Sequence, residues 1–322
     1  GVLGMVYAER RVSAFIQDRV GPNRVGPKGL LQPIADGIKF LMKEDIIPDR
    51  ADKPIFILAP AILLIPALMT FAVIPFGSPI TLFGREIALQ VADINVGILY
   101  ILALTSISVY GIVLAGWSSN NKYSLLGGLR SSAQLISYEL AMGLAVVSII
   151  LLSGSLKLND IISNQQGSFL SWNIFKQPLA FLIFLVAVYA ETNRLPFDLS
   201  EAEQELVGGY HTEYSSMKFA MFFMAEYANM ITAAALTVTL FFGGWDVPLL
   251  DEGSLGIVGT IISVLSFIMK MAFFLFLFIW VRWTFPRFRY DQLMRLGWKV
   301  LLPLALVNIF LTAGYLTLQA SN

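Results

Sequence analysis

Residues 55–76 read IFILAPAILLIPALMTFAVIPF and contain no charged side chain. A helix needs roughly 20 mostly apolar residues to cross the hydrocarbon core of a bilayer, so this stretch predicts a transmembrane helix. Similar runs follow it at residues 94–117, 131–153, 219–242, 257–281 and 301–318, and a shorter one covers residues 174–190. The sequence therefore predicts seven spans after residue 54.

The first residues are also apolar. Residues 1–8, GVLGMVYA, end abruptly at Glu9-Arg10-Arg11, and we interpret them as the last two turns of an eighth span whose beginning is absent. They do not resemble a signal peptide, in which basic residues precede the apolar stretch. We expect an all-α integral membrane protein with about eight transmembrane helices, the first only partly present.

Composition agrees with a bundle in lipid. The 322 residues are 57% hydrophobic and 14% charged, whereas about a quarter of the residues of a soluble domain are charged. Length alone would suggest about two soluble domains, but the apolar content favours one transmembrane bundle domain over residues 1–322.

Lysine and arginine predict the orientation. The connections 9–53, 118–130, 191–218 and 282–299 hold 18 of these residues and the opposite connections hold 3. Such residues are retained on the cytoplasmic side. We expect a bacterial inner membrane protein with long cytoplasmic loops at 9–53, 191–218 and 282–299, or matrix-facing loops if it is mitochondrial. Long loops on one side favour docking of soluble partners.

Several kinds of chemistry are excluded or disfavoured. Without cysteine the chain can hold neither disulfides nor its own iron–sulfur cluster, and one histidine makes a haem or metal site improbable. The charge balance of 22 against 22 gives no sign of nucleic-acid binding. We expect no cofactor on this chain and no metal site.

The loop 9–53 contains two turn signals, VGPN and VGPK, and then IADGIKFLMKE at 34–44. Ile34, Ile38 and Leu41 share one face at helical spacing, which predicts an amphipathic helix along the membrane surface. From the pattern alone, it is either a plain anchor or part of a binding site.

Charged side chains also lie at membrane depth. Glu139 and Glu226 interrupt apolar runs, Glu191 closes the short span, and Lys270 lies in mid-span. Charges there are costly and usually serve a function in a wet or paired interior. They indicate proton handling, or a structural pairing such as Lys270 with a glutamate.

Three polar residues precede Glu139 on the same predicted helix. Arg130, Gln134 and Tyr138 are four residues apart and share a face, and Glu139 lies about 100° around the helix from Tyr138.

The connection 191–214 reads ETNRLPFDLSEAEQELVGGYHTEY and is strongly acidic. Crowded carboxylates raise one another's pKa values and can pass protons among themselves. Two plainer interpretations remain open: a solvated acidic loop, or Asp198 and Ser200 capping a helix that begins at Glu201. We assign no role to His211. The connection holds one cation, Arg194, and six carboxylates: Glu191, Asp198, Glu201, Glu203, Glu205 and Glu213.

These segments together resemble the family of the quinone-site membrane subunit of respiratory complex I, the NADH:quinone oxidoreductase. Its members are the H-type subunit of bacteria and NADH dehydrogenase subunit 1 of mitochondria. The resemblance covers almost the whole chain and is carried, in order, by ERR (9–11), RVGPNRVGPKGLLQPIADGIKF (19–40), SSNNKYSLLGGLRSSAQLISYE (118–139), the connection 191–214, FFMAEYAN (222–229) and FPRFRYDQLM (285–294).

The resemblance implies that the chain builds a quinone chamber with peripheral partners. One partner carries the terminal iron–sulfur cluster, and a flavin lies on another part of the complex. The resemblance also implies further membrane subunits as neighbours, and it implies no binding of nucleic acid. By position, the quinone entrance and channel residues are Glu9, Arg10, Arg19, Asp36 and Phe40, and a segment near the same partners holds Arg287, Arg289 and Asp291.

The resemblance also implies a proton path from the quinone chamber into the membrane. Quinone reduction places negative charge in a low-dielectric cavity, where nearby ionisable groups respond strongly. The implied path comprises Glu201, Glu203, Glu205 and Glu213 on the loop, then Glu191, Glu139 and Glu226; the supporting residues are Arg130, Gln134, Tyr138, Arg194, Asp198 and Lys270.

Two alternatives remain. One is the equivalent subunit of a membrane-bound hydrogenase or a ferredoxin-driven complex, which use other electron donors. The other is a stand-alone ion transporter, which the buried glutamates would suit but the absent internal repeats and large one-sided loops disfavour.

Overall fold

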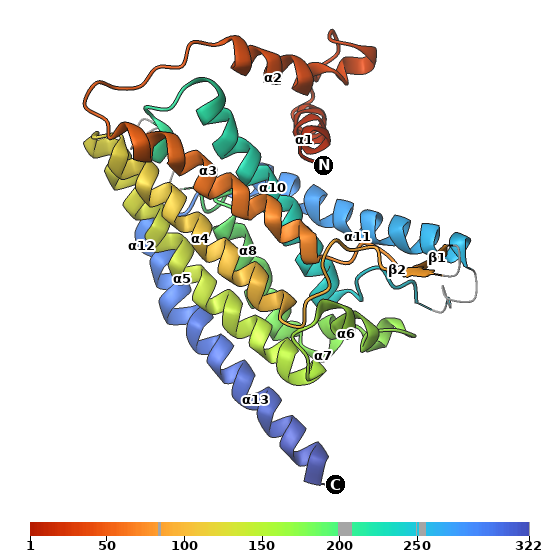
Figure 1. Cartoon of the computed structure of the whole chain (residues 1–322). Coiled ribbons are helices and arrows are strands. Elements are labelled where there is room, and N and C mark those ends of the chain that lie inside the picture. The colour runs from red at the N-terminus through yellow and green to blue at the C-terminus, as the bar shows by residue number, and fades with distance from the viewer. Residues whose placement is uncertain (83–84, 199–207, 249, 251–255, 322) are drawn as a thin grey trace.

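Helices make up most of the computed structural model, which describes every residue except 83–84, 199–207, 249, 251–255 and 322 (Figure 1). Short 3₁₀ turns cover Pro27–Gly29 (η1), Thr70–Val73 (η2), Phe169–Ser171 (η3) and Gly209–His211 (η4), and strands β1 (Ile80–Leu82) and β2 (Arg85–Ile87) pair antiparallel. The α-helices are α1 (Val2–Ile16), α2 (Gln32–Met42), α3 (Lys53–Met69), α4 (Gly97–Ser118), α5 (Lys122–Ser153), α6 (Leu158–Ser163), α7 (Asn173–Lys176), α8 (Pro178–Glu191), α10 (Ser216–Phe241), α11 (Ile257–Thr284), α12 (Tyr290–Leu296) and α13 (Leu302–Ser321).

The prediction of an all-α membrane protein is confirmed. Within the described residues, six helical segments are long and apolar enough to cross a membrane. The total of eight spans and the single domain stay predictions. The six segments are Lys53–Val73, Gly97–Ser118, Lys122–Ser153, Ser216–Phe241, Ile257–Thr284 and Tyr290–Ser321.

The short span predicted at 174–190 is broken near its start. Gln177 has φ −137° and ψ 58°, and α8 begins at Pro178. Proline has no backbone N–H and disfavours the helical conformation of the residue before it, so the chain breaks there. The 14 residues of α8 rise only ~21 Å, which is less than the ~30 Å hydrocarbon core.

Two predicted boundaries differ from the structure. α5 begins at Lys122 rather than residue 131, because Asn121 caps the helix by accepting a hydrogen bond from Tyr123 N at 2.9 Å. The predicted loop 282–299 is mostly helical: a π-helical turn, Gly297–Leu301, joins α12 to α13. Hydropathy marks where a helix leaves the apolar region, not where the helix ends.

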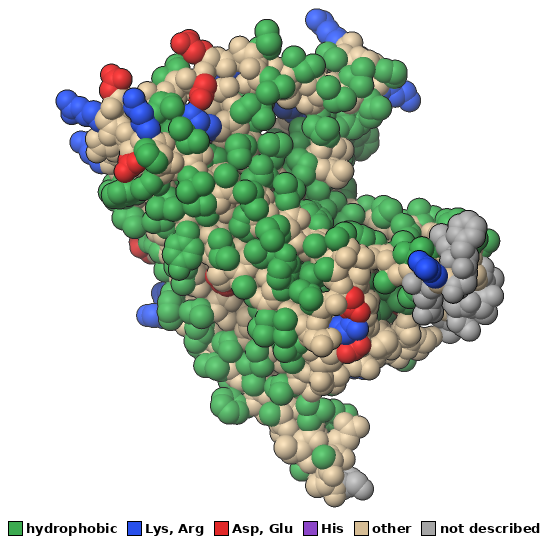
Figure 2. Space-filling view, in the orientation of Figure 1, with side chains coloured by type: hydrophobic (Ala, Val, Ile, Leu, Met, Phe, Trp, Pro, Cys, Tyr) green, Lys and Arg blue, Asp and Glu red, His purple; other side chains and the backbone are tan. Residues whose placement is uncertain are grey.

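The surface helix predicted in the first loop is α2. It lies across one end of the bundle, next to α1, and its Ile34, Ile38 and Leu41 are exposed (Figure 1). Figure 2 shows charged side chains gathered at this end, with a broad hydrophobic surface below them. This arrangement suits a helix lying where lipid meets water.

The bundle brings distant segments together. α3 packs on α4 and α10, α4 on α5, and α5 on α8 and α13. A Cβ on Gly127 of α5 would lie 2.7 Å from Gly209 Cα, so glycine is needed there for the η4 turn to approach α5.

Candidate functional site

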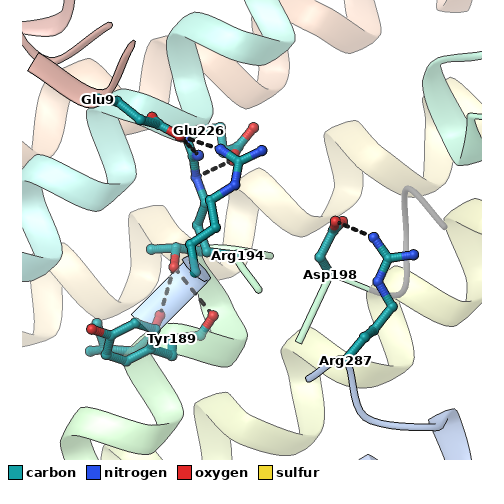
Figure 3. Close-up of polar contacts among 9 residues, drawn as sticks. Glu9, Tyr189, Arg194, Asp198, Glu226 and Arg287 are labelled. Carbon is teal, nitrogen blue, oxygen red and sulfur yellow. Dashed lines mark hydrogen bonds and ion pairs between the residues drawn. The ribbon is translucent and has the colours of Figure 1, made fainter. Parts of the chain in front are cut away.

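Two carboxylates and two guanidinium groups from four segments meet inside the bundle (Figure 3). Glu9 on α1 accepts hydrogen bonds from Arg194 Nη1 at 2.7 Å and from Arg282 Nη1. Arg194 Nε lies 2.6 Å from Glu226 Oε1 on α10, an ion pair whose angle does not suit a hydrogen bond. The Tyr227 ring centroid is 4.6 Å from Arg194 Cζ. We name these five residues the Glu9 cluster.

Three charged members of the Glu9 cluster are largely shielded from water, whereas the side chain of the fourth, Arg282, is 38% exposed. The side chains of Glu9, Arg194 and Glu226 are 7%, 9% and 16% exposed. Burial opposes the charge on Arg194, but Glu226 and then Glu9 more than offset it, so the pKa of this guanidinium is raised above its usual value. Because the cluster balances two carboxylates with two cations at low dielectric, gaining or losing one proton changes its electrostatic energy strongly.

A second ion pair lies beside the Glu9 cluster. Arg287 Nη2 donates to Asp198 Oδ2 at 3.0 Å (Figure 3). Burial raises the pKa of the Asp198 carboxyl, and Arg287 only partly opposes this rise. The rings of Phe197 and Phe288 stack with centroids 5.4 Å apart, which holds the Asp198 segment against the turn before α12.

Two cavities lie beside the Glu9 cluster and the other membrane carboxylates, and both are lined by Glu226. The cluster cavity, about 140 Å³, touches Arg194, Arg282, Asp198 and Glu226. The central cavity, about 30 Å³, is lined by Glu226, Glu191 and Glu139 among other residues. A cavity needs roughly 10–15 Å³ to hold a water. Glu226 therefore lies between the two cavities, and the three intramembrane carboxylates share one water-sized space.

Glu139 also reaches the outside of the bundle. Ser106 Oγ of α4 donates a hydrogen bond to Glu139 Oε1. The same glutamate lines an outer groove of about 620 Å³ with Leu302 and Leu306 of α13. Glu139 thus connects the central cavity with a surface on the flank of the bundle.

The helix face that precedes Glu139 packs on the site. Gln134 Nε2 donates to the carbonyls of Ala190 at 2.8 Å and Phe197 at 2.9 Å. Tyr138 Oη donates to the Leu293 carbonyl at 2.9 Å. Arg130 Cζ lies 5.7 Å from the Tyr290 ring centroid. These contacts fix α5 against the end of α8 and against α12.

The predicted quinone residues are divided between the interior and the loop side. Arg10 forms an ion pair with Asp36, which joins α1 to α2. Phe40 packs near Phe219, with ring centroids 6.0 Å apart. Arg19 is exposed and donates to Gln17 Oε1 at 2.6 Å. Only Glu9 of this set lies in the buried cluster.

Other predicted residues lie away from the cavities that hold the membrane carboxylates. Glu213 accepts a hydrogen bond from Asn121 Nδ2 at 2.6 Å, at the loop end of α4 and α5. Lys270 Nζ donates to the carbonyls of Phe242, Gly244 and Asp246, at 2.9, 3.0 and 2.7 Å.

The remaining predicted positions lie at the start of α12 or in the undescribed loop. Arg289 is the N-cap residue of α12, and Asp291 is exposed in its first turn. Glu201, Glu203 and Glu205, with the possible cap Ser200, lie outside the described residues.

Sequence reasoning missed Arg282, Tyr227, Ser106 and Asn229. Arg282 lies at the end of a predicted span, and in the sequence it contributes only to the prediction of which side of the membrane the loops face. A cation at this position can also turn inward and pair with a buried carboxylate. Asn229 follows Glu226 at a spacing of three residues, so its nearness to that carboxylate is a usable signal, whereas helical spacing gives no such signal for the adjacent Tyr227.

His211 is expected to make the stability of the protein depend on pH. Burial lowers the pKa of its imidazole to about 4, whereas an unfolded histidine titrates near 6.5. The unfolded state therefore binds more protons between these values, so stability is full above about pH 6.5 and falls by about 2–3 kcal/mol toward pH 4.

Thermal unfolding of the detergent-purified chain at pH 7.5 and pH 5 measures this effect. His211→Gln is expected to lose less stability on acidification than the parent chain. An equal loss in both proteins would show that His211 is not responsible.

The fold and the site define a class: a multi-pass helical membrane protein whose buried ionisable groups line small cavities. Within this class, the chain belongs to the NADH dehydrogenase family, whose model matches residues 1–313. It is 58% identical over 315 residues to an H-type subunit of the NADH-quinone oxidoreductase of Geobacter metallireducens, covering 98% of this chain and 92% of the relative.

Two further relatives are similar over nearly the same length. NADH-quinone oxidoreductase subunit 8 of Rhodothermus marinus is 58% identical, with 96% of this chain and 91% of the relative covered. An H-type subunit of the same kind of enzyme from Cytophaga hutchinsonii is 54% identical, with 97% and 91% covered. The resemblance noted from the sequence motifs is thereby confirmed.

Proposed function

We propose that this chain is the quinone-site membrane subunit of a proton-pumping NADH:quinone oxidoreductase and acts only within that complex. The names of its relatives support the complex. One observation carries the site: Glu9, which belongs by position to the quinone channel, and Glu226, which lines the central cavity, share the single cation Arg194.

This shared cation suggests how electron arrival affects protons. Negative charge formed on a quinone near α1 and α2 would attract Arg194 and Arg282 away from their carboxylates. Glu9 and Glu226 would then be less well compensated and would bind protons more strongly. Because Glu226 also lines the central cavity, protons would pass from there toward Glu191 and Glu139.

The other components follow from the same proposal. Cysteine is absent from the sequence, so the iron–sulfur cluster that donates electrons would lie on a peripheral partner and the flavin farther along the complex. The end that carries α2 would face the cytoplasm and receive these partners, because the cationic connections lie there. The flank with the outer groove would face other membrane subunits.

Arg19→Ala tests the quinone assignment. Because the Arg19 side chain is exposed and its one hydrogen bond among the described residues is to Gln17, its removal should leave the fold intact. A lost hydrogen bond to a charged group, about 1.5–3 kcal/mol, should raise the KM for quinone about tenfold or more. NADH oxidation by ferricyanide, which needs no quinone site, should not change.

Arg24→Ala is the matched control, because Arg24 is another exposed arginine of the same loop. Its KM for quinone should equal that of the parent complex. An unchanged KM in both variants, with normal assembly, would remove Arg19 from the proposed quinone channel.

A further inference from the structure

The side chain of Asn229 is polar, lies at membrane depth, and takes no part in the proposed path. It lies on α10 three residues after Glu226, so both side chains point to the same side of the helix. The side chain is half-buried, and in the part of the chain that the structure describes its amide makes no hydrogen bond. A half-buried amide in the membrane without a partner is costly, and water usually satisfies such a group where there is room.

Asn229 has room beside it on two sides. It lines the central cavity with Glu226 and Glu191. It also lines a second cavity of about 30 Å³, which extends along α4 and α10 toward Thr232 and Leu240. Each cavity exceeds the roughly 10–15 Å³ that one water needs. The residues common to both cavities are Thr105, Glu191, Thr192 and Asn229.

Three hydroxyl groups of the central cavity donate to backbone carbonyls, and one of them, that of Thr105, also contacts the Glu191 carboxylate. Thr105 donates to the Leu102 carbonyl at 2.9 Å, Ser108 to the Thr105 carbonyl at 2.6 Å, and Thr192 to the Val188 carbonyl at 3.1 Å. An amide has two N–H donors and an acceptor oxygen. Asn229 can therefore donate to water as well as accept from it, which these hydroxyls cannot do while they keep their bonds.

We propose that Asn229 is a positioning residue that holds water between Glu226 and Glu191. The proposal rests on the proposed function, since it supplies a step within that proton path. A protonated carboxyl gives its proton to the held water, and the water releases another of its protons to the second carboxylate. One proton moves, no electrons are transferred, and Asn229 itself stays neutral throughout.

The test compares Asn229→Leu with Asn229→Gln in the assembled complex reconstituted into liposomes. Leucine has a similar volume but cannot bind water, so NADH:quinone turnover and proton pumping should fall about tenfold. The solvent isotope effect on turnover in D₂O should rise, because proton transfer becomes slower. Glutamine keeps the amide and should restore most of the rate.

Asn308→Leu is the matched control. Asn308 is also a buried amide in the membrane, but it donates to Ser148 Oγ at 2.9 Å and Gln177 Oε1 at 3.1 Å, away from both cavities. Its loss should lower thermal stability without changing the isotope effect. A full rate and an unchanged isotope effect for Asn229→Leu would overturn the role of Asn229.

A second variant and a second measurement separate the possible failures. If Glu139→Gln lowers pumping while Asn229→Leu does not, only the role of Asn229 fails; if neither variant matters, the carboxylate path itself fails. Should Asn229→Leu not assemble, water density in the parent complex decides. We expect a water within hydrogen-bond distance of the Asn229 amide in the central cavity, and its absence at a resolution that shows other buried waters would overturn the proposal.

Discussion

Replacing Arg194 with methionine is expected to destabilise the protein by about 3–5 kcal/mol, because removing one partner of a buried ion pair leaves uncompensated charge. Here two carboxylates, those of Glu9 and Glu226, lose the cation that they share. Arg282 still reaches Glu9, but Glu226 keeps no ion pair among the described residues. Denaturant unfolding in detergent and the yield of assembled complex measure the effect.

A double variant distinguishes charge from packing. Adding Glu226→Gln to Arg194→Met removes the uncompensated carboxylate and should recover part of the lost stability. Arg295→Met, at an exposed position of α12, serves as the control and should change stability by less than about 0.5 kcal/mol. Stability of Arg194→Met equal to that of the parent chain would mean that the Glu9 cluster is not held together by its charges.

Much of the fold follows from local patterns in the sequence. Long apolar runs predict spans because lipid admits few charged side chains, and the period of Ile34, Ile38 and Leu41 predicts α2. The break at Gln177 was less accessible: hydropathy continues across it, although Pro178 was a usable signal. The early start of α5 was missed because Lys122 to Arg130 is too polar to score as a span, yet helical hydrogen bonds continue through it.

The candidate site was predictable in its residues but not in its pairings. Glu139, Glu191 and Glu226 are visible in the sequence because charge in an apolar run is costly. Nothing local indicates that Glu9 at one end of the chain lies against Arg194 and Arg282, because tertiary packing of α1, α10 and α11 decides that contact. A single sequence without its fold therefore yields the ionisable groups but not the order in which they connect.

Glu139→Gln is expected to leave assembly intact and to lower coupled turnover by roughly tenfold or more, since a positioned proton-transfer group contributes about 10²–10⁴-fold. The amide keeps an oxygen that can accept the hydrogen bond of Ser106, so the packing of α4 on α5 should persist. It cannot take up or release a proton, however, and Glu139 is the carboxylate that lines both the central cavity and the outer groove.

Quinone reduction and proton pumping by the complex in liposomes, with and without an uncoupler, measure this loss. Turnover should stay low with the uncoupler, because the block lies in proton transfer and not in back-pressure from the proton gradient. Glu44→Gln, at an exposed carboxylate on the loop after α2, should behave as the parent complex does. If Glu139→Gln pumps at the parent rate, protons do not leave the central cavity through this residue, and the path must end at Glu191 or run along the second cavity beside Asn229.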